Sequence, residues 1–120
     1  MTDSIRALAT RFFGAIESGD VDAVAACYAP DVRIWHNNDR KEQTRDENLA
    51  VIKGLFKAFT ELRYEDARLI TYEGGFVEQH IFTGKMANGG KLELPACIIA
   101  QVRDGLITRI DEYFDTAALS

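Results

Sequence analysis

The first part of the chain has hydrophobic residues at helical spacing. Ile5, Leu8, Phe12 and Ile16 recur every three or four positions, and they predict a helix that ends at Gly19. Asp20 is suited to cap a second, short helix that carries Val21, Val24, Ala25 and Tyr28 and stops at Pro30. The stretch from Val32 to His36 then reads as a short strand.

A third helix is predicted after a polar loop. The segment Thr44-Arg45-Asp46-Glu47 matches a capping box, in which the side chains of Thr44 and Glu47 each accept a hydrogen bond from the other residue's backbone N–H. One face of the helix that follows carries Leu49, Ile52, Phe56 and Phe59.

From Arg63 onward the hydrophobic pattern changes to the period of two that is typical of strands. Turn signals at Gly74-Gly75, Asn88-Gly89-Gly90 and Asp104-Gly105 divide this part into strands near 63–73, 76–86, 91–103 and 106–115. Helices followed by hairpin-connected strands predict an α+β fold, with a curved and mostly antiparallel sheet wrapped around three N-terminal helices.

The strand at 91–103 is apolar on both faces. If Leu94, Ala96, Ile98 and Ala100 face the core, then Cys97, Ile99 and Gln101 lie on the outer face. A strand that is apolar on both sides needs cover on both sides. A second copy of the chain could cover the outer face, so we expect a homodimer that uses it.

Length and charge narrow the class of protein. The 120 residues fit one domain, 1–120, and 47% are hydrophobic. The net charge is -5 with scattered Lys and Arg, which argues against a nucleic-acid partner. We expect no membrane partner, because no segment is apolar enough to be a signal peptide or a membrane span.

The two cysteines, Cys27 and Cys97, both lie in apolar runs. They predict free buried thiols and a cytoplasmic protein.

Three sequence segments resemble those of a known protein family. They are the segment from Arg11-Phe12-Phe13 to Ser18-Gly19-Asp20-Val21-Asp22, the segment Tyr28-Ala29-Pro30-Asp31-Val32, and the run from Asp104-Gly105-Leu106 to Tyr113-Phe114-Asp115. Together with the order of elements, they resemble the nuclear transport factor two-like superfamily over nearly the whole chain. SnoaL-like proteins are the most similar, and the last phrase is similar to limonene epoxide hydrolases. The resemblance implies a cystatin-like α+β barrel with a conical pocket.

Strand alternation selects the chemistry that could line such a pocket. The inward faces would carry Ile34 with His36, then Phe76, Glu78, His80 and Phe82, and finally Ile110, Glu112 and Phe114. We therefore predict His36, His80 and Glu112 as catalytic residues. The predicted pocket walls are Phe12, Tyr28, Ile34, Phe56, Phe82, Ile110 and Phe114. Trp35 and Tyr113 fall on outward positions.

The resemblance points to the same three positions. His36 falls where ketosteroid isomerases have their aspartate base and where epoxide hydrolases have a water-positioning asparagine. His80 and Glu112 fall where epoxide hydrolases have an arginine and an aspartate. Other positions depart from both patterns: Phe82 replaces the second hydrolase aspartate. The isomerase tyrosine corresponds to Phe12, and the isomerase's protonated aspartate corresponds to Cys97 or Ile98.

These residues predict a small-molecule pocket protein that acts as an acid–base enzyme of isomerase, cyclase or hydratase/hydrolase type. A histidine in an apolar pocket is a suitable base near neutral pH. The alternative from a different class is a catalytically silent ligand-binding or accessory dimer. Phosphate-binding and nucleophile-elbow motifs are absent from the sequence, and no cofactor or metal is expected.

Each site residue also has a purely structural alternative. His36 could be a partly exposed histidine, and His80 could be a core histidine satisfied by a carboxylate. Glu112 could pair with Arg109 or Arg68 at the surface. Two histidines and a carboxylate could also form an iron site of the facial-triad type.

Overall fold

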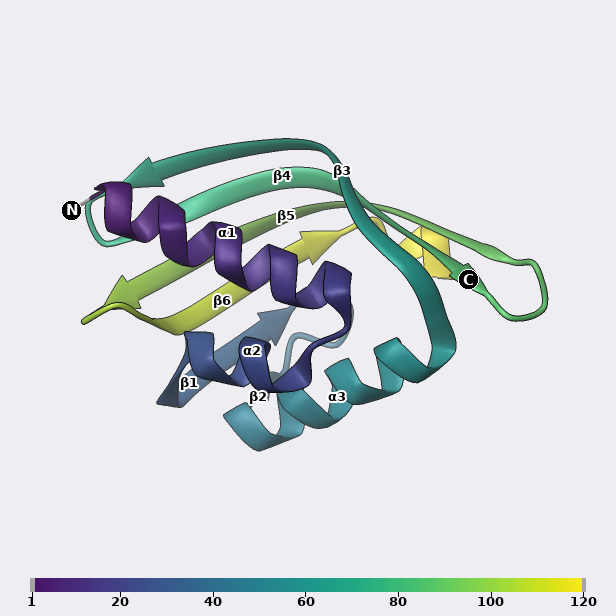
Figure 1. Cartoon of the computed structure of the whole chain (residues 1–120), viewed down its shortest axis with the longest axis horizontal. Helices are drawn as coiled ribbons and strands as arrows, with labels where there is room; N and C mark the ends of the chain where they lie inside the picture. The colour runs from purple at the N-terminus through teal and green to yellow at the C-terminus, as the bar shows by residue number, and fades with distance from the viewer. Residues whose placement is uncertain (1, 120) are drawn as a thin grey trace.

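Within residues 2–119, which this computed structural model describes, six strands form one sheet and three α-helices lie on one side of it (Figure 1). The sheet order is β2-β1-β6-β5-β4-β3. The helices are α1 (Thr2–Ser18), α2 (Val21–Cys27) and α3 (Arg45–Ala58). The strands are β1 (Tyr28–His36), β2 (Glu42–Gln43), β3 (Phe59–Tyr72), β4 (Gly75–Met86), β5 (Lys91–Arg103) and β6 (Leu106–Phe114), followed by the short helix η1 (Thr116–Leu119).

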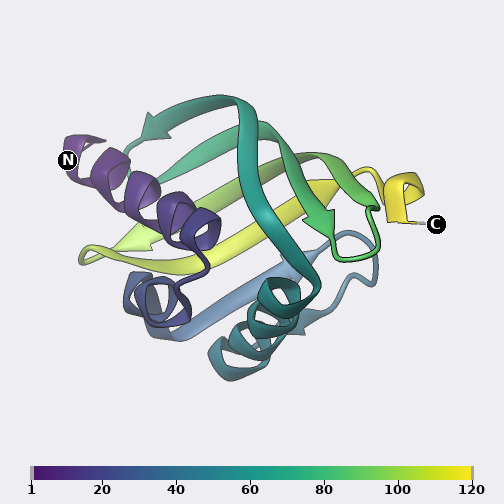
Figure 2. The ribbon, with the colours of Figure 1, turned by 45° about the vertical axis from the view of Figure 1, so that its right-hand side comes forward.

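The predicted α+β class is confirmed. β1 pairs with β6 in parallel, whereas the other neighbouring strands are antiparallel. The sheet curls around the helices, as Figure 2 shows, so that its concave face and the helices enclose the core. Buried side chains of α1, including Leu8 and Phe12, pack there against Phe76 and Ile98 of the sheet.

The predicted helix starts are also present. Asp20 caps α2 by accepting a hydrogen bond from the backbone N–H of Ala23. Thr44 and Glu47 form the reciprocal capping box at the start of α3. Gly19 has φ of +71°, a conformation that glycine adopts readily, and this residue separates α1 from α2.

Two boundaries differ from the prediction. Helix α2 ends at Cys27, and Tyr28 begins β1 rather than closing the helix. Pro30 lies inside β1, in the irregular stretch where its pairing with β6 is interrupted, so its missing N–H removes no ladder bond. Phe59 begins β3, and its backbone N–H bonds the carbonyl of Leu55 as the cap of α3. Hydrophobic spacing alone cannot separate a last helical turn from the residue after it.

The two faces of β5 follow the predicted alternation. Leu94, Ile98 and Ala100 are buried in the core, whereas Ile99 is 36% exposed on the other face. Cys27 and Cys97 are both free thiols, as predicted, but only Cys27 is buried, because Cys97 lies on the outer face of β5 and is partly exposed. None of the helices within residues 2–119 combines the length and the apolar character that a membrane span requires.

Candidate functional site

A pocket of about 140 Å³ opens between α1, α3 and the concave face of the sheet. Five of the predicted wall residues line it: Phe12, Tyr28, Ile34, Phe82 and Ile110. Two further predicted residues, Phe56 and Phe114, pack against the core beside the pocket without lining it. The remaining lining residues are Ile16, His36, Asn48, Val51, Ile52, Leu55, Tyr64, Ile98 and Glu112.

His36 and Glu112 lie side by side at the mouth of this pocket. They are partners in the parallel register of β1 and β6, so one sheet position brings both side chains to the concave face. Nε2 of His36 is 3.2 Å from Oε1 of Glu112, and the side chains are 18% and 20% exposed. The ring of Phe114 lies edge-on to His36, with 6.3 Å between ring centroids. The pair is thus partly buried and lines the pocket.

Glu112 does not form the surface ion pair with Arg109 that was its structural alternative. Arg109 instead binds Asp111 on its own strand, with Nη2 at 2.9 Å from Oδ1, and also binds Glu42 of β2. These contacts raise the pKa of Arg109, first through the hydrogen bond to Asp111. Because Arg109 binds Asp111 and Glu42 on the outer face, it does not pair with Glu112. The Glu112 carboxylate lies in the pocket and contacts His36.

Two consecutive hydrogen bonds join Tyr28 of β1, Asn48 of α3 and Gln43 of β2 beside the pocket. The hydroxyl of Tyr28 donates to Oδ1 of Asn48 at 2.7 Å, and Nδ2 of Asn48 donates to Oε1 of Gln43 at 2.8 Å. Burial raises the pKa of Tyr28, and the nearby charge of Glu112 raises it further. Asn48 escaped the sequence analysis, although it precedes Ile52 by one helical turn on the buried face of α3.

The prediction that His80 would line the same pocket is wrong. Its side chain is fully buried, and Nδ1 forms a 2.7 Å hydrogen bond with Oε2 of Glu78, which is also buried. Residues two apart on a strand point to the same face. The alternation that places His80 on the inner face therefore places the Glu78 carboxylate beside it. Phe13 of α1 lies over this pair, with 5.7 Å between the Phe13 and His80 ring centroids.

Because His80 is held by Glu78, the three residues considered for an iron site do not converge. Within the part of the chain that the structure describes, no group of three or more His, Cys, Asp or Glu side chains is arranged to hold a metal ion.

Tyr64 of β3 is a pocket residue that sequence reasoning missed. It lines the pocket, and its ring packs on His80 and Phe82, with centroid separations of 4.5 and 4.7 Å. Burial raises the pKa of Tyr64 well above its ordinary value, and the charges of Glu112 and Glu78 add to this effect. No regular alternation along the strand leads to Tyr64, because the pairing of β3 with β4 shifts on both sides of it.

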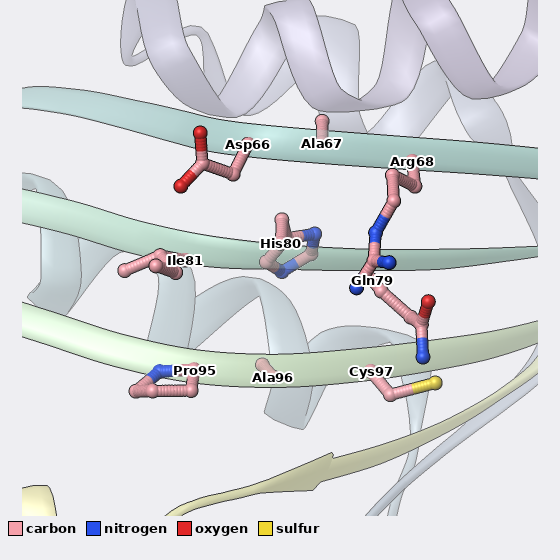
Figure 3. Close-up of a pocket in the computed structure, with 9 residues that line it drawn as sticks. All are labelled: Asp66, Ala67, Arg68, Gln79, His80, Ile81, Pro95, Ala96 and Cys97. Carbon is pink, nitrogen blue, oxygen red and sulfur yellow. The ribbon is translucent and has the colours of Figure 1, made fainter.

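The outer face of the sheet carries a larger and more open hollow of about 680 Å³. Figure 3 shows its lining residues on three neighbouring strands, among them Arg68 of β3, Gln79 of β4 and Cys97 of β5. Exposed apolar side chains, including Ile70 and Ile99, lie on the same strands. Tyr113 is exposed as predicted, and Trp35 packs against it.

Comparisons with known proteins agree with this architecture. The family model of the SnoaL-like domain matches residues 9–110. A solved structure of a candidate polyketide cyclase from Xanthomonas campestris pv. campestris is 22% identical, with a TM-score of 0.86 over 98% of this chain and 95% of that chain. An NTF2-like protein from Burkholderia xenovorans LB400 is 21% identical, with a TM-score of 0.79 over 99% of this chain and 95% of that chain.

A hypothetical protein with a ketosteroid isomerase-like fold from Catenulispora acidiphila DSM 44928, in complex with trimethylamine, is 12% identical. Its TM-score is 0.80 over 92% of this chain and 87% of that chain. Among curated proteins there is no match. At these identities the likenesses establish a shared fold, which hosts more than one activity.

Proposed function

Since the chain belongs to the SnoaL-like domain family, we propose that it is an acid–base enzyme that moves a proton on a small, mainly apolar substrate. The observation that carries the proposal is the His36–Glu112 pair, 3.2 Å apart at the mouth of a pocket with apolar walls. A titratable pair beside an apolar cavity is the arrangement that proton-transfer catalysis needs.

The two side chains have different tasks in this proposal. Glu112 faces Nε2 of His36, so it favours the tautomer with the proton on Nε2 and leaves Nδ1 as the proton acceptor. The carboxylate also stabilises the imidazolium that forms when Nδ1 takes the substrate proton. The contact is looser than an aligned hydrogen bond, as is common for catalytic pairs before substrate binds.

A catalytically silent binding protein of the same fold is the competing function. A pocket already filled by aromatic side chains would favour it. Phe76 is buried in the core and Phe82 contributes only one wall, which leaves about 140 Å³ of space beside His36 and Glu112. This space is room for a ligand in either case, and the His36–Glu112 pair beside it supports the enzyme over the silent protein.

Isomerisation of a small unsaturated ketone tests the proposal. The purified protein is incubated with cyclohex-3-en-1-one, and the conjugated product is followed by its ultraviolet absorbance. We expect turnover that saturates with substrate and scales with enzyme concentration. Incubation in deuterium oxide, followed by NMR, detects proton exchange even where no net isomerisation accumulates. Binding of the ketone without exchange or isomerisation would favour the silent protein.

We also propose that two copies of the chain pair through the outer face of the sheet. The support is the hollow across β3, β4 and β5, together with Ile70 and Ile99, which are 63% and 36% exposed. Such an apolar face is stabilised by burial against a partner.

The dimer is tested by light scattering at micromolar concentration. The wild type is expected to scatter as a dimer, and Ile99→Glu is expected to shift it to a monomer because a charge would be buried in the contact. Lys53→Glu, on the exposed side of α3, is the matched control and should remain dimeric. A monomeric wild type would count against the proposal.

A further inference from the structure

The hollow on the outer face of the sheet lies next to exposed apolar side chains on the same strands. Its lining includes Arg68 of β3, Gln79 of β4 and Cys97 of β5 (Figure 3). Two residues further along β3 and β5 are Ile70 and Ile99, which are both exposed. Because side chains two apart on a strand point to the same face, one surface carries both a depression and apolar protrusions beside it.

The strand register arranges these side chains in two rows across β3, β4 and β5. The first row lies in the hollow, and the second row lies beside it. In register order, the first row is Arg68, Gln79 and Cys97, and the second row is Ile70, Val77 and Ile99. Residues two apart on a strand are separated by about 6.6 Å, so a shift of one row carries the apolar row onto the hollow.

Charge favours a second copy of the chain as the occupant of this surface. Each copy has a net charge of -5, so two copies repel each other wherever like charges meet. Within the two rows only Arg68 is charged, and Asp66 of the opposite charge lies beside it at the hollow. The centre of the rows on β4 and β5 carries no charge, which is the composition of an interface core.

The other half of the outer face is less suited to close contact. There Arg109 of β6 binds Asp111 on its own strand and Glu42 of β2, so an ion-pair network crosses β6, β1 and β2. Burial of such a network against an apolar surface would cost desolvation free energy. The contact between two copies is therefore expected to centre on β4 and β5 rather than on the middle of the whole sheet.

We propose that two copies stack outer face to outer face, with β5 antiparallel to the partner's β5 and offset by one row, so that Ile99 of each copy enters the hollow of the other. The two-fold axis then lies between the sheets and crosses β5 between Cys97 and Ile99. This inference rests on the proposed dimer and adds its register. The symmetry makes the contact reciprocal, since each copy supplies both the protrusion and the hollow.

This register fixes the separation of the two Cys97 residues. Stacked sheets lie about 10 Å apart, and an offset of one row adds about 6.6 Å along the strand. The Cα atom of Cys97 should therefore lie about 12 Å from the Cα atom of the partner's Cys97, beyond the reach of a disulfide, which is about 7 Å. A short reagent that joins two thiols can still span the pair.

Cross-linking with 1,2-bis(maleimido)ethane tests the register. The wild type should give a covalent dimer on a denaturing gel, and the covalent fraction should not change when the protein is diluted within the range where it remains a dimer. Cys97→Ser should abolish the covalent dimer. Cys27→Ser is the matched control and should keep it, because Cys27 is buried in the core. Copper-catalysed oxidation should produce at least tenfold less covalent dimer than the maleimide reagent does.

Two relocated thiols distinguish this register from other ways of stacking the same faces. Both are made in the Cys97→Ser background. Gln79→Cys lies in the same row as Cys97 and should cross-link to its copy in the partner. Gln101→Cys lies on β5, two residues beyond Ile99, and is exposed. It should not cross-link, because the offset along the strand between the two copies is then about 20 Å.

Light scattering on the same samples separates the two proposals. A monomeric wild type overturns the proposed dimer and the register with it. A dimeric wild type that fails to cross-link through Cys97, or that cross-links through Gln101→Cys as well as through Gln79→Cys, keeps the dimer and overturns the register. Turnover of cyclohex-3-en-1-one is measured on the protein without reagent, so the acid–base proposal is tested independently. Melting temperatures establish that the variants fold.

Discussion

Replacing Glu78 by alanine is expected to destabilise the folded protein by roughly 3–5 kcal/mol, because it removes one member of a buried, hydrogen-bonded pair. Glu78 accepts from Nδ1 of His80 at 2.7 Å, and Nε2 of His80 already lacks a partner within the described residues. The substitution would leave the whole imidazole unsatisfied beneath Phe13 and Tyr64. Thermal unfolding should then occur roughly 10 °C or more below that of the wild type.

Two further variants distinguish a broken pair from a general loss of charge. Glu61→Ala removes an exposed ion pair with Lys85 and should leave the melting temperature unchanged, because exposed pairs contribute little. The double variant Glu78→Leu with His80→Phe replaces both polar groups by apolar ones and should recover most of the lost stability. If Glu78→Ala unfolds at the same temperature as Glu61→Ala, the buried pair does not stabilise the fold.

Much of the fold could be predicted because the signals are local. The capping box at Thr44 and the cap at Asp20 depend on neighbouring residues, so their hydrogen bonds form as the sequence indicates. Alternation in β5 likewise placed Ile98 inward and Ile99 outward. The start of β1 was missed because Tyr28 can pack on the core from a helix or from a strand, and Pro30 is tolerated where the pairing of β1 with β6 is interrupted.

The candidate site was predictable in part for the same reason. His36 and Glu112 were found because alternation holds over Val32–His36 and Ile110–Phe114, the parts of β1 and β6 that carry them, and His36 pairs in register with Glu112. Sequence reasoning placed Glu78 and His80 on one face but could not show that they bond each other rather than the pocket. Tyr64 was missed because it lies between two bulges, where alternation cannot be followed along the strand.

The proton acceptor can be tested directly at His36. His36→Ala is expected to lower kcat for cyclohex-3-en-1-one by about 10²–10⁴-fold, the usual contribution of a general base. The melting temperature should change little, because the side chain is partly exposed and lies only in a loose contact with Glu112. Glu112→Gln keeps the size of the side chain but loses its charge, so it should lower the rate less than His36→Ala does.

Chemical rescue distinguishes a catalytic role of His36 from a structural one. Removing the His36 ring leaves a space at the pocket mouth beside Glu112 and Phe114, which free imidazole can enter. Added imidazole should restore part of the rate of His36→Ala in proportion to its unprotonated fraction, because only the neutral ring accepts a proton. It should not restore Glu112→Gln, where the imidazole base is intact. A His36→Ala variant that keeps the wild-type rate would remove the His36–Glu112 pair from the mechanism. Loss of activity together with a collapsed melting temperature would assign His36 to the fold instead.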